Sequence, residues 1–204
     1  MSKALQTTII IFAKAPESGF AKTRLIPALG AQGAADFAQR MLNHAANQAA
    51  GARLGRVFMA TTPNQNHPVF NALATQHQLT LIDQGDGDLG QRMQTAFDTV
   101  WNHTPDHPIL LMGSDIPAIN AAMLNDAARQ LQRCDAVFIP TFDGGYALVG
   151  LKKSSPTLLT EMTWSHPQVM QITRNKAERI GLHCHELAPV HDIDEPEDLQ
   201  HWTP

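Results

Sequence analysis

The sequence predicts a three-layer α/β/α fold, in which helices cover both faces of a mixed, mostly parallel sheet. Short apolar runs with strand character alternate along the chain with longer segments of helical periodicity. Two of these runs, residues 9–13 and 109–112, are apolar at nearly every position, as strands buried on both faces are. Helix-length segments between successive strands favour crossover connections and therefore parallel pairing.

Strands are expected where the apolar runs are short and turn residues bound them. Their predicted ranges are 8–13, 56–60, 79–82, 109–112, 136–140, 146–151 and 183–187. The run at 146–151 follows the turn sequence Asp143-Gly144-Gly145, with no helix between it and the preceding run. A hairpin-like reversal is expected there, which makes this strand antiparallel within the sheet.

Helices are expected where apolar residues recur at helical spacing. Their predicted ranges are 32–50, 69–77, 90–101, 121–132 and 168–180. Asp88 is positioned to cap the third of these, because an Asp side chain accepts hydrogen bonds from the free amides of a first turn. No linker, low-complexity run or internal repeat interrupts the pattern. Residues 1–204 are therefore expected to form a single domain.

Composition limits the classes of function open to the chain. A formal net charge of −4 over 204 residues gives no polyanion-binding field, so nucleic acid is not expected as a partner. No apolar run approaches the ~20 residues of a membrane span, and no signal-peptide core is recognised near the N-terminus. Cys134 and Cys184 lie far apart in the sequence and are expected to be unpaired thiols of a cytoplasmic protein.

The loop behind the first predicted strand carries three cations, Lys14, Lys22 and Arg24. Ligands of open α/β sheets bind at the carboxyl ends of the strands, so this loop predicts phosphate binding, with Arg24 able to hold two phosphate oxygens. The loop lacks the glycines of the Walker-type phosphate loop and of the dinucleotide fingerprint. These mismatches argue against kinase-like hydrolysis and NAD binding. The alternative is a solvated basic loop without a ligand.

Asp115 follows the buried run at 109–112 directly, after the small residues Gly113 and Ser114, which would let a ligand approach the backbone. Mg²⁺ and Mn²⁺ prefer oxygen ligands and usually take one or two carboxylates together with phosphates. Asp115 is therefore predicted to bind a divalent metal ion, with Gly113 and Ser114 beside the nucleotide. The alternative is that Asp115 only caps the following helix.

Two further segments supply carboxylates. In the sequence DIDEPEDL, Asp192 and Asp194 alternate with an isoleucine and would face the same side of an extended segment. Asp192 is predicted as a second metal ligand or a catalytic base, whereas Asp194 either caps a helix near Pro196 or is a further ligand. Asp143 is a candidate to orient or deprotonate an acceptor hydroxyl, although Asp-Gly-Gly is also a common turn sequence.

A glycine-rich loop, QGDGDLGQRM, precedes the helix expected at 90–101. Gly87 permits close approach of a ligand to the backbone, and the helix offers free amides. Gln91 and Arg92 project from the first turn, where either could contact a base, a ribose or a sugar. The alternative is a capped helix without a ligand.

Five sequence words in this order resemble the nucleotide-diphospho-sugar transferase superfamily, which has the glycosyltransferase-A fold. They are FAKAPESGFAKTRL, QGDGDLGQRM, GSDIP, DGGYALVGL and DIDEPEDL. The bacterial branch they resemble most contains radical-SAM/selenodomain-associated or arsenosugar-biosynthesis glycosyltransferases. The resemblance implies a Rossmann-like nucleotide-binding sheet, a divalent metal near Asp115 and phosphate contacts from Lys14, Lys22 and Arg24.

The chain departs from that superfamily's glycosyltransferases at the metal site. They usually carry Asp-x-Asp, whereas this chain has a single Asp in Ser114-Asp115-Ile116-Pro117. The single Asp resembles nucleotidyltransferases such as 2-phospho-L-lactate guanylyltransferase and molybdenum-cofactor guanylyltransferase. However, the Gly-Gly-x-x-x-Arg start of many nucleotidyltransferases is missing, and DGGY replaces the Gly-Thr-Asn of the phospholactate enzymes.

The leading hypothesis is a metal-dependent glycosyltransferase that uses Mg²⁺ or Mn²⁺ and a nucleoside-diphosphate sugar, and transfers the sugar to a small-molecule acceptor. The first alternative is a nucleotidyltransferase that joins a nucleoside triphosphate to a phosphorylated acceptor and releases pyrophosphate. The second is a nucleotide-binding protein without catalysis. All three use the same cations and carboxylates.

Overall fold

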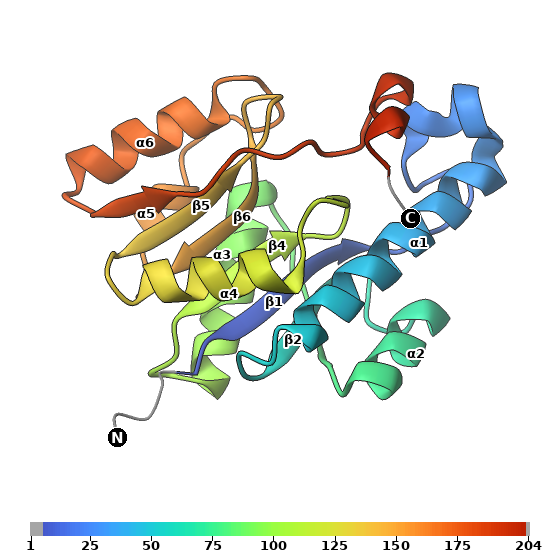
Figure 1. Cartoon of the computed structure of the whole chain (residues 1–204). Helices are drawn as coiled ribbons and strands as arrows, with labels where there is room; N and C mark the ends of the chain where they lie inside the picture. Colours follow the sequence, from blue (N-terminus) through green and yellow to red (C-terminus); the bar gives the residue numbers. More distant parts are fainter. Residues whose placement is uncertain (1–5, 203–204) are drawn as a thin grey trace.

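The computed structural model describes residues 6–202 and confirms the α/β fold class (Figure 1). Seven strands form one sheet in the order β3-β2-β1-β4-β6-β5-β7. They are β1 (Thr8–Lys14), β2 (Val57–Thr62), β3 (Thr80–Asp83), β4 (Ile109–Gly113), β5 (Ala136–Pro140), β6 (Tyr146–Leu151) and β7 (Cys184–Glu186). All seven strands coincide with predicted ones, apart from small differences at their ends.

The sheet is mixed, as predicted. β1 pairs in parallel with β2 and β4, β2 with β3, and β5 with β7. β6 runs antiparallel to both β4 and β5, which confirms the reversal expected at the Asp143-Gly144-Gly145 turn. The carboxyl ends of all strands except β6 therefore lie at the same edge of the sheet.

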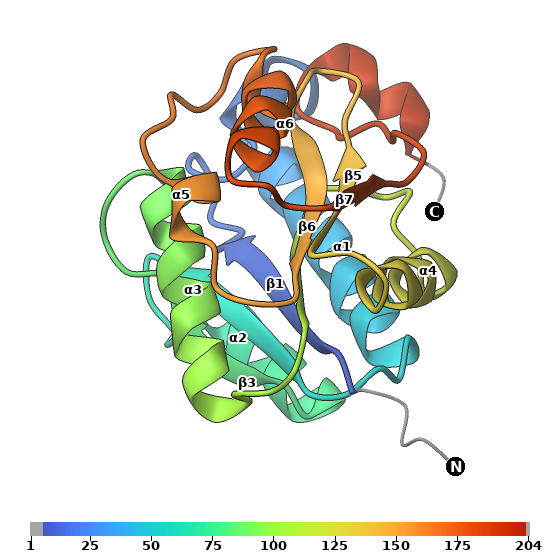
Figure 2. The ribbon, with the colours of Figure 1, turned by 90° about the vertical axis from the view of Figure 1, so that its left-hand side faces the viewer.

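Helices cover both faces of this sheet, which gives the three layers (Figures 1 and 2). One face packs against α1 (Ile26–Gly51), α2 (Pro68–His77) and α4 (Ala121–Leu131), and the other against α3 (Leu89–His103), α5 (Pro156–Leu159) and α6 (Val169–Arg179). Successive side chains of a strand point to opposite faces. Ile9 and Ile11 of β1 therefore enter the first core and Ile10 enters the second, and all three are fully buried.

Two helices differ from the prediction. α1 begins at Ile26 rather than at residue 32, because its first turns continue across a kink at Gly30, whose φ of 69° favours glycine. α5 was not predicted, since four residues are too few to show helical periodicity. Within the described residues, no helix is both long and apolar enough to cross a membrane.

The C-terminal segment brings late residues back to the start of the chain. It runs from β7 to a short 3₁₀ helix, η2 (Pro196–His201), beside the beginning of α1 (Figure 1, red). Ile193 is fully buried there against Leu25, Phe37 and Met41, in a small core separate from the two main cores on the faces of the sheet. Burial of Ile193 therefore fixes its neighbours Asp192 and Asp194 near the loop behind β1.

Candidate functional site

A cavity of about 570 Å³ lies at the edge of the sheet where the parallel strands end. A second cavity of about 340 Å³ lies beside it, behind the β1 loop. The predicted site residues on the wall of the first are Lys14, Arg92, Gly113, Ser114, Asp115, Asp143 and Asp192. Lys22 and Arg24 line the second, and Lys14, Ser114, Asp115 and Asp194 line both. The two cavities therefore meet at the loop after β4.

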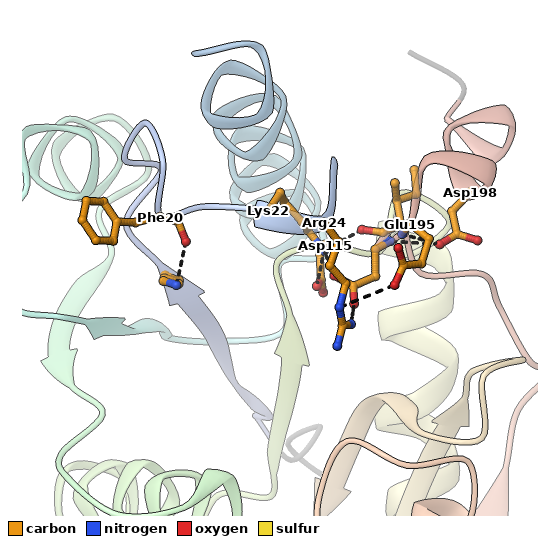
Figure 3. Close-up of polar contacts among 9 residues, drawn as sticks. Phe20, Lys22, Arg24, Asp115, Glu195 and Asp198 are labelled. Atoms are coloured by element: carbon orange, nitrogen blue, oxygen red, sulfur yellow. Dashed lines mark hydrogen bonds and ion pairs between the residues drawn. The ribbon is translucent and has the colours of Figure 1, made fainter. Parts of the chain in front are cut away.

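Lys22 lines the second cavity and contacts Asp115, which lines both (Figure 3). Its Nζ donates hydrogen bonds to Asp115 Oδ2 at 2.9 Å and to the Ile193 carbonyl at 2.5 Å, and it lies 3.4 Å from Asp194 Oδ1. The side chain is only 11% exposed. Burial lowers the pKa of Lys22, but the two carboxylates raise it more, so the net shift is upward and the amine remains protonated.

The backbone of Lys22 helps to place this amine. Its φ of 46° and ψ of 49° are left-handed, a conformation that side-chain-bearing residues rarely adopt, at the start of the 3₁₀ helix η1 (Thr23–Leu25). Leu25 is fully buried in the core that also holds Ile193. The same small core thus fixes both the cationic loop and the segment that carries Asp194.

The other two predicted cations are less buried. Arg24 pairs with Asp194 and lies with its Nε 3.5 Å from Glu195 Oε1 (Figure 3), and the charge of Asp194 is the main reason that the pKa of Arg24 is raised. Lys14 donates from Nζ to the Phe20 carbonyl at 2.7 Å. This bond crosses the base of the loop, so Lys14 both closes the loop and lines the two cavities.

Asp115 does not cap a helix. α4 begins at Ala121, and the Asn120 side chain accepts the hydrogen bond from the Met123 amide that a cap provides. The Asp115 side chain is 41% exposed. A Cβ at Gly113 would lie 2.9 Å from Asp115 Oδ1, so the glycine leaves room for the carboxylate in this position. Asp115 is therefore free of a structural role in α4 and faces Lys22 and the cavities.

Asp143 and Asp192 approach the first cavity from different segments. Asp143 Oδ1 accepts hydrogen bonds from the Gly145 amide at 3.0 Å and from the Thr141 hydroxyl, so Asp143 also closes the β5–β6 turn. Burial raises the pKa of Asp192 to about 6, and the charges of Asp143 and Asp115 contribute to the shift while Lys22 opposes it. The three carboxylates are thus close enough to influence one another.

The glycine-rich loop forms the capped helix that was considered as an alternative. Asp88 Oδ1 accepts from the Gln91 amide and Gln91 Oε1 accepts from the Asp88 amide, each at 2.9 Å, which is a reciprocal capping box. Gly87 has a φ of 106°, and a Cβ there would lie 2.4 Å from Gln91 Oε1. Neither Gly87 nor Gln91 is among the residues that line the two cavities. Nucleotide binding by these two residues stays a prediction.

Arg92 does line the first cavity, and it has a partner that the sequence interpretation missed. Gln84, which is only 2% exposed, donates from Nε2 to the carbonyls of Ala13 and Ala60, each at 2.9 Å, and its Oε1 accepts from Arg92. The Arg92 guanidinium also lies 5.6 Å from the centre of the Phe12 ring. The signal in the sequence was a long amide directly after a strand, at the edge where ligands bind.

Asp194 is a further correction. Of its two alternatives, a helix cap or a further metal ligand, the helix cap is wrong, because Glu195 caps η2 and Asp198 accepts from the amides of Asp194 and Glu195. The Asp194 side chain instead faces Lys22 and Arg24. The two cations compete successfully for this carboxylate, since they lie beside it in the fold and a helix amide offers only a partial charge.

The donor set of the cavity fits a divalent ion that also binds phosphate. In residues 6–202, no group of three or more His, Cys, Asp or Glu side chains could hold a metal ion by itself. Mg²⁺ and Mn²⁺ bound with phosphates need only one or two carboxylates. Asp115 and Asp192 line the same cavity, and their mutual repulsion contributes to the raised pKa of Asp192. A cation between them would relieve that repulsion.

Solved structures share this fold. A protein from Desulfovibrio desulfuricans G20, which carries the provisional name nucleotide-diphospho-sugar transferase, is 29% identical with a TM-score of 0.84, over 94% of this chain and 83% of that one. A cytidylyltransferase from Leptospira borgpetersenii serovar Hardjo-bovis is 15% identical with a TM-score of 0.59, over 98% and 89% of the two chains. A Mycobacterium tuberculosis H37Rv protein in complex with manganese is 15% identical with a TM-score of 0.55, over 96% and 97%.

A sequence comparison identifies the family. No curated protein sequence matches the chain at a significant level. The profile of a family described as "Uncharacterized protein conserved in bacteria (DUF2064)" matches residues 45–166, which is more than half of the chain. The chain therefore belongs to the bacterial family DUF2064, and its fold is that of the nucleotide-diphospho-sugar transferase superfamily.

Proposed function

We propose that this chain is a metal-dependent transferase that takes a sugar from a nucleoside-diphosphate sugar and passes it to a small-molecule acceptor. The observation that carries the proposal is the 2.9 Å contact between Lys22 and Asp115. Because these two side chains are in contact, a single diphosphate could reach both the cation of the β1 loop and the predicted metal ligand, which supports the proposal. The similarity to the Desulfovibrio protein supports the same function.

In this proposal the cations bind the diphosphate. Lys22, Arg24 and Lys14 lie around the junction of the two cavities, where Gly113 and Ser114 expose the backbone after β4. Charge develops on the diphosphate as the sugar leaves, and preorganised cations stabilise it strongly. Lys22 and Arg24 would exchange their contacts with Asp194 for contacts with phosphate oxygens.

Asp115 and Asp192 would hold the Mg²⁺ or Mn²⁺ ion. The bound ion would add Lewis-acid stabilisation of the leaving diphosphate. The manganese complex of the Mycobacterium protein, which shares the fold, supports this choice of metal.

The carboxylates on the other side of the cavity would act on the acceptor. Asp143 keeps one oxygen, Oδ2, free of the hydrogen bonds that close its turn. Asp192 has a pKa of about 6, which suits a proton acceptor near neutral pH better than an ordinary Asp does. Either carboxylate could orient or deprotonate an acceptor hydroxyl, and Asp192 would do so only if Asp115 alone holds the metal.

Nucleotidyl transfer is the second candidate, favoured by the single Asp of the sequence Gly-Ser-Asp-Ile-Pro and by the cytidylyltransferase that shares the fold. The same cations would then hold the β- and γ-phosphates of a nucleoside triphosphate, and pyrophosphate would be the leaving group. One assay separates the candidates. The protein with Mn²⁺ is incubated with UDP-, GDP- and TDP-sugars and, separately, with nucleoside triphosphates.

Hydrolysis or transfer of a sugar from any diphosphate donor supports glycosyl transfer. Release of pyrophosphate from a triphosphate, with water taking the nucleotidyl group in place of the acceptor, supports nucleotidyl transfer and overturns the leading proposal. Metal-dependent binding without any product would leave a nucleotide-binding protein without catalysis. The variant Asp115→Asn serves as the control in every arm, because it should lose the metal-dependent signal.

We also propose that residues 1–204 form a single domain and that the protein is cytoplasmic. All seven strands belong to one sheet, which supports treating residues 1–204 as a single domain. Cys134 and Cys184 are both free thiols, which supports the cytoplasmic location expected from the sequence.

A further inference from the structure

One part of the first cavity has no lysine or arginine on its wall, within the part of the chain that the structure describes. It lies between the β5–β6 turn and the segment that precedes α6, and its wall includes Thr141, Asp143, Tyr146, Trp164, His166 and Asp192. In the sheet, β5 and β6 are separated from β1 by β4. This part therefore lies on the opposite side of Asp115 from Gln84 and Arg92, and it is where an acceptor would bind in the proposed function.

Its aromatic residues offer hydrogen-bond donors without partners. Tyr146 Oη and Trp164 Nε1 are both buried, and neither has a hydrogen-bond partner among the described residues. The two rings are in contact edge to face, with centroids 6.3 Å apart. Burial raises the pKa of Tyr146, so the phenol keeps its proton and remains a donor. A buried donor without a partner destabilises the folded chain, and a ligand oxygen would supply the missing acceptor.

His166 adds a third donor. Its Nδ1 accepts a hydrogen bond from the Gln168 amide at 3.1 Å. The neutral imidazole therefore carries its proton on Nε2, which is then available to a ligand.

The same wall also offers acceptors. Asp143 Oδ2 takes no part in the hydrogen bonds of its turn, and Asp192 contributes a second carboxylate. The only Lys and Arg side chains on the wall of this cavity, among the described residues, are engaged elsewhere. Lys14 donates to the Phe20 carbonyl and Arg92 to Gln84. Of residues 6–202, no Lys or Arg side chain is therefore directed toward the two carboxylates from this part of the wall.

This combination selects one kind of functional group. A hydroxyl both donates to a carboxylate and accepts from an N–H or O–H group, whereas a phosphate only accepts and carries the same charge as the carboxylates. We propose that the subsite formed by Asp143, Tyr146 and Trp164, joined by Asp192 where Asp115 alone holds the metal, binds an uncharged, polyhydroxylated acceptor and disfavours its phosphate ester. The proposal rests on the proposed transferase function and favours glycosyl transfer over nucleotidyl transfer to a phosphorylated acceptor.

Matched pairs of small molecules test this selectivity. Saturation-transfer NMR and competition titrations would compare glycerol with glycerol 3-phosphate, and glucose with glucose 6-phosphate. The full chain would be used with Mg²⁺ and whichever of UDP, GDP or TDP raises its melting temperature most. We expect the unphosphorylated members to bind, and the phosphate esters to bind at least about tenfold more weakly, as one unfavourable charge contact predicts.

Variants separate the subsite from general effects. Asp143→Asn should reduce the ratio of affinities, unphosphorylated molecule over phosphate ester, by about fivefold or more, because it removes one repelling charge. Tyr146→Phe keeps the ring but removes the donor, and should lower affinity for the unphosphorylated members by about fivefold. The matched control is Asp106→Asn, in an exposed loop before β4 at the other edge of the sheet. It should change neither the affinity ratio nor the affinity for the unphosphorylated molecules.

Equal or tighter binding of the phosphate esters would overturn the proposal, as would the absence of binding by both unphosphorylated members in the presence of the bound diphosphate. If no diphosphate binds with or without metal, the proposed transferase function fails instead. The matched pairs of small molecules are then compared without nucleotide. Tighter binding of the unphosphorylated members would still support the selectivity of the subsite, and equal or tighter binding of the phosphate esters would overturn it.

Discussion

Lys22 Nζ lies 2.9 Å from Asp115 Oδ2, although the two residues are 93 positions apart in the chain. Lys22 belongs to the loop behind β1 and Asp115 to the loop behind β4, and these two strands are neighbours in the sheet. The contact therefore follows from the parallel pairing of β1 and β4, which brings both carboxyl ends to one edge. It joins the predicted phosphate loop and the predicted metal ligand into one site.

Removal of the Lys22 charge should weaken both ligand binding and folding. In Lys22→Gln, Asp115 and Asp194 lose the cation between them, so the free energy of unfolding should fall by about 1–2 kcal/mol. Affinity for a nucleoside diphosphate should fall about 10- to 100-fold. Urea denaturation and titration calorimetry measure the two effects. Lys153→Gln, at an exposed position outside both cavities, is the control, and an equal loss in that variant would contradict the account.

Gln84 should affect nucleotide binding through Arg92. Gln84→Met keeps the length of the side chain but removes the hydrogen bond that holds the Arg92 guanidinium. We expect affinity for the diphosphate to fall about fivefold in Gln84→Met, and to fall no further when this change is added to Arg92→Ala. The measurement is a double-mutant cycle on the dissociation constant. Independent, additive effects would show that Gln84 only ties β1 and β2 together.

Asp192 should make stability depend on pH in a defined direction. Its pKa in the folded protein is about 6, above the ordinary value, so the folded state binds the proton more tightly than the unfolded chain does. The stabilisation from the neutral form is therefore present at low pH and is lost as the pH rises through about 6. Asp192→Asn, which cannot ionise, should raise the melting temperature clearly at pH 7.5 and little at pH 4.

This comparison is made in metal-free buffer, because a bound cation would itself lower the pKa of Asp192. Asp106→Asn, with an exposed side chain, supplies the control. A melting-temperature difference between Asp192→Asn and the natural protein that stays constant across this pH range would show that Asp192 has an ordinary pKa.

Gly113→Ala should disturb Asp115 without changing any charge. The added methyl group would lie 2.9 Å from Asp115 Oδ1, which is too close for an unshifted carboxylate. We expect the enhancement of diphosphate binding by Mn²⁺ to drop about tenfold, because the predicted metal ligand moves. Calorimetric titrations with and without Mn²⁺ measure this enhancement of diphosphate binding. Gly51→Ala, where the new methyl group meets Ala121 only at 4.0 Å, should leave the enhancement intact.

The fold was largely predictable because its signals are local. The runs that became β1 and β4 are apolar on both faces, and the Asp-Gly-Gly turn identified the antiparallel strand β6. The capping box of α3 likewise depends on two residues three apart, and Asp88 was predicted as its cap. Periodicity failed for α5, which is shorter than two turns, and for the start of α1, where Gly30 interrupts the helical geometry.

The contacts of the site were less predictable because they join distant segments. The residue types and the strand ends indicated Lys22, Arg24 and Asp115, but nothing local showed that Asp194 would turn toward Lys22 and Arg24 instead of capping a helix. That outcome depends on the burial of Ile193 beside Leu25, which only the complete fold determines. Gln84 was missed for the same reason, since its partners lie on β1, β2 and α3.

The most direct test of the central claim is a calorimetric titration of the protein with UDP, GDP and TDP, with and without Mn²⁺, repeated on Asp115→Asn. If the β1 loop and Asp115 surround one diphosphate, at least one nucleotide should bind, Mn²⁺ should tighten that binding, and Asp115→Asn should lose the tightening while keeping weak, metal-independent binding. Failure of all three nucleotides to bind, or a Mn²⁺ effect that is the same in Asp115→Asn, would contradict the account.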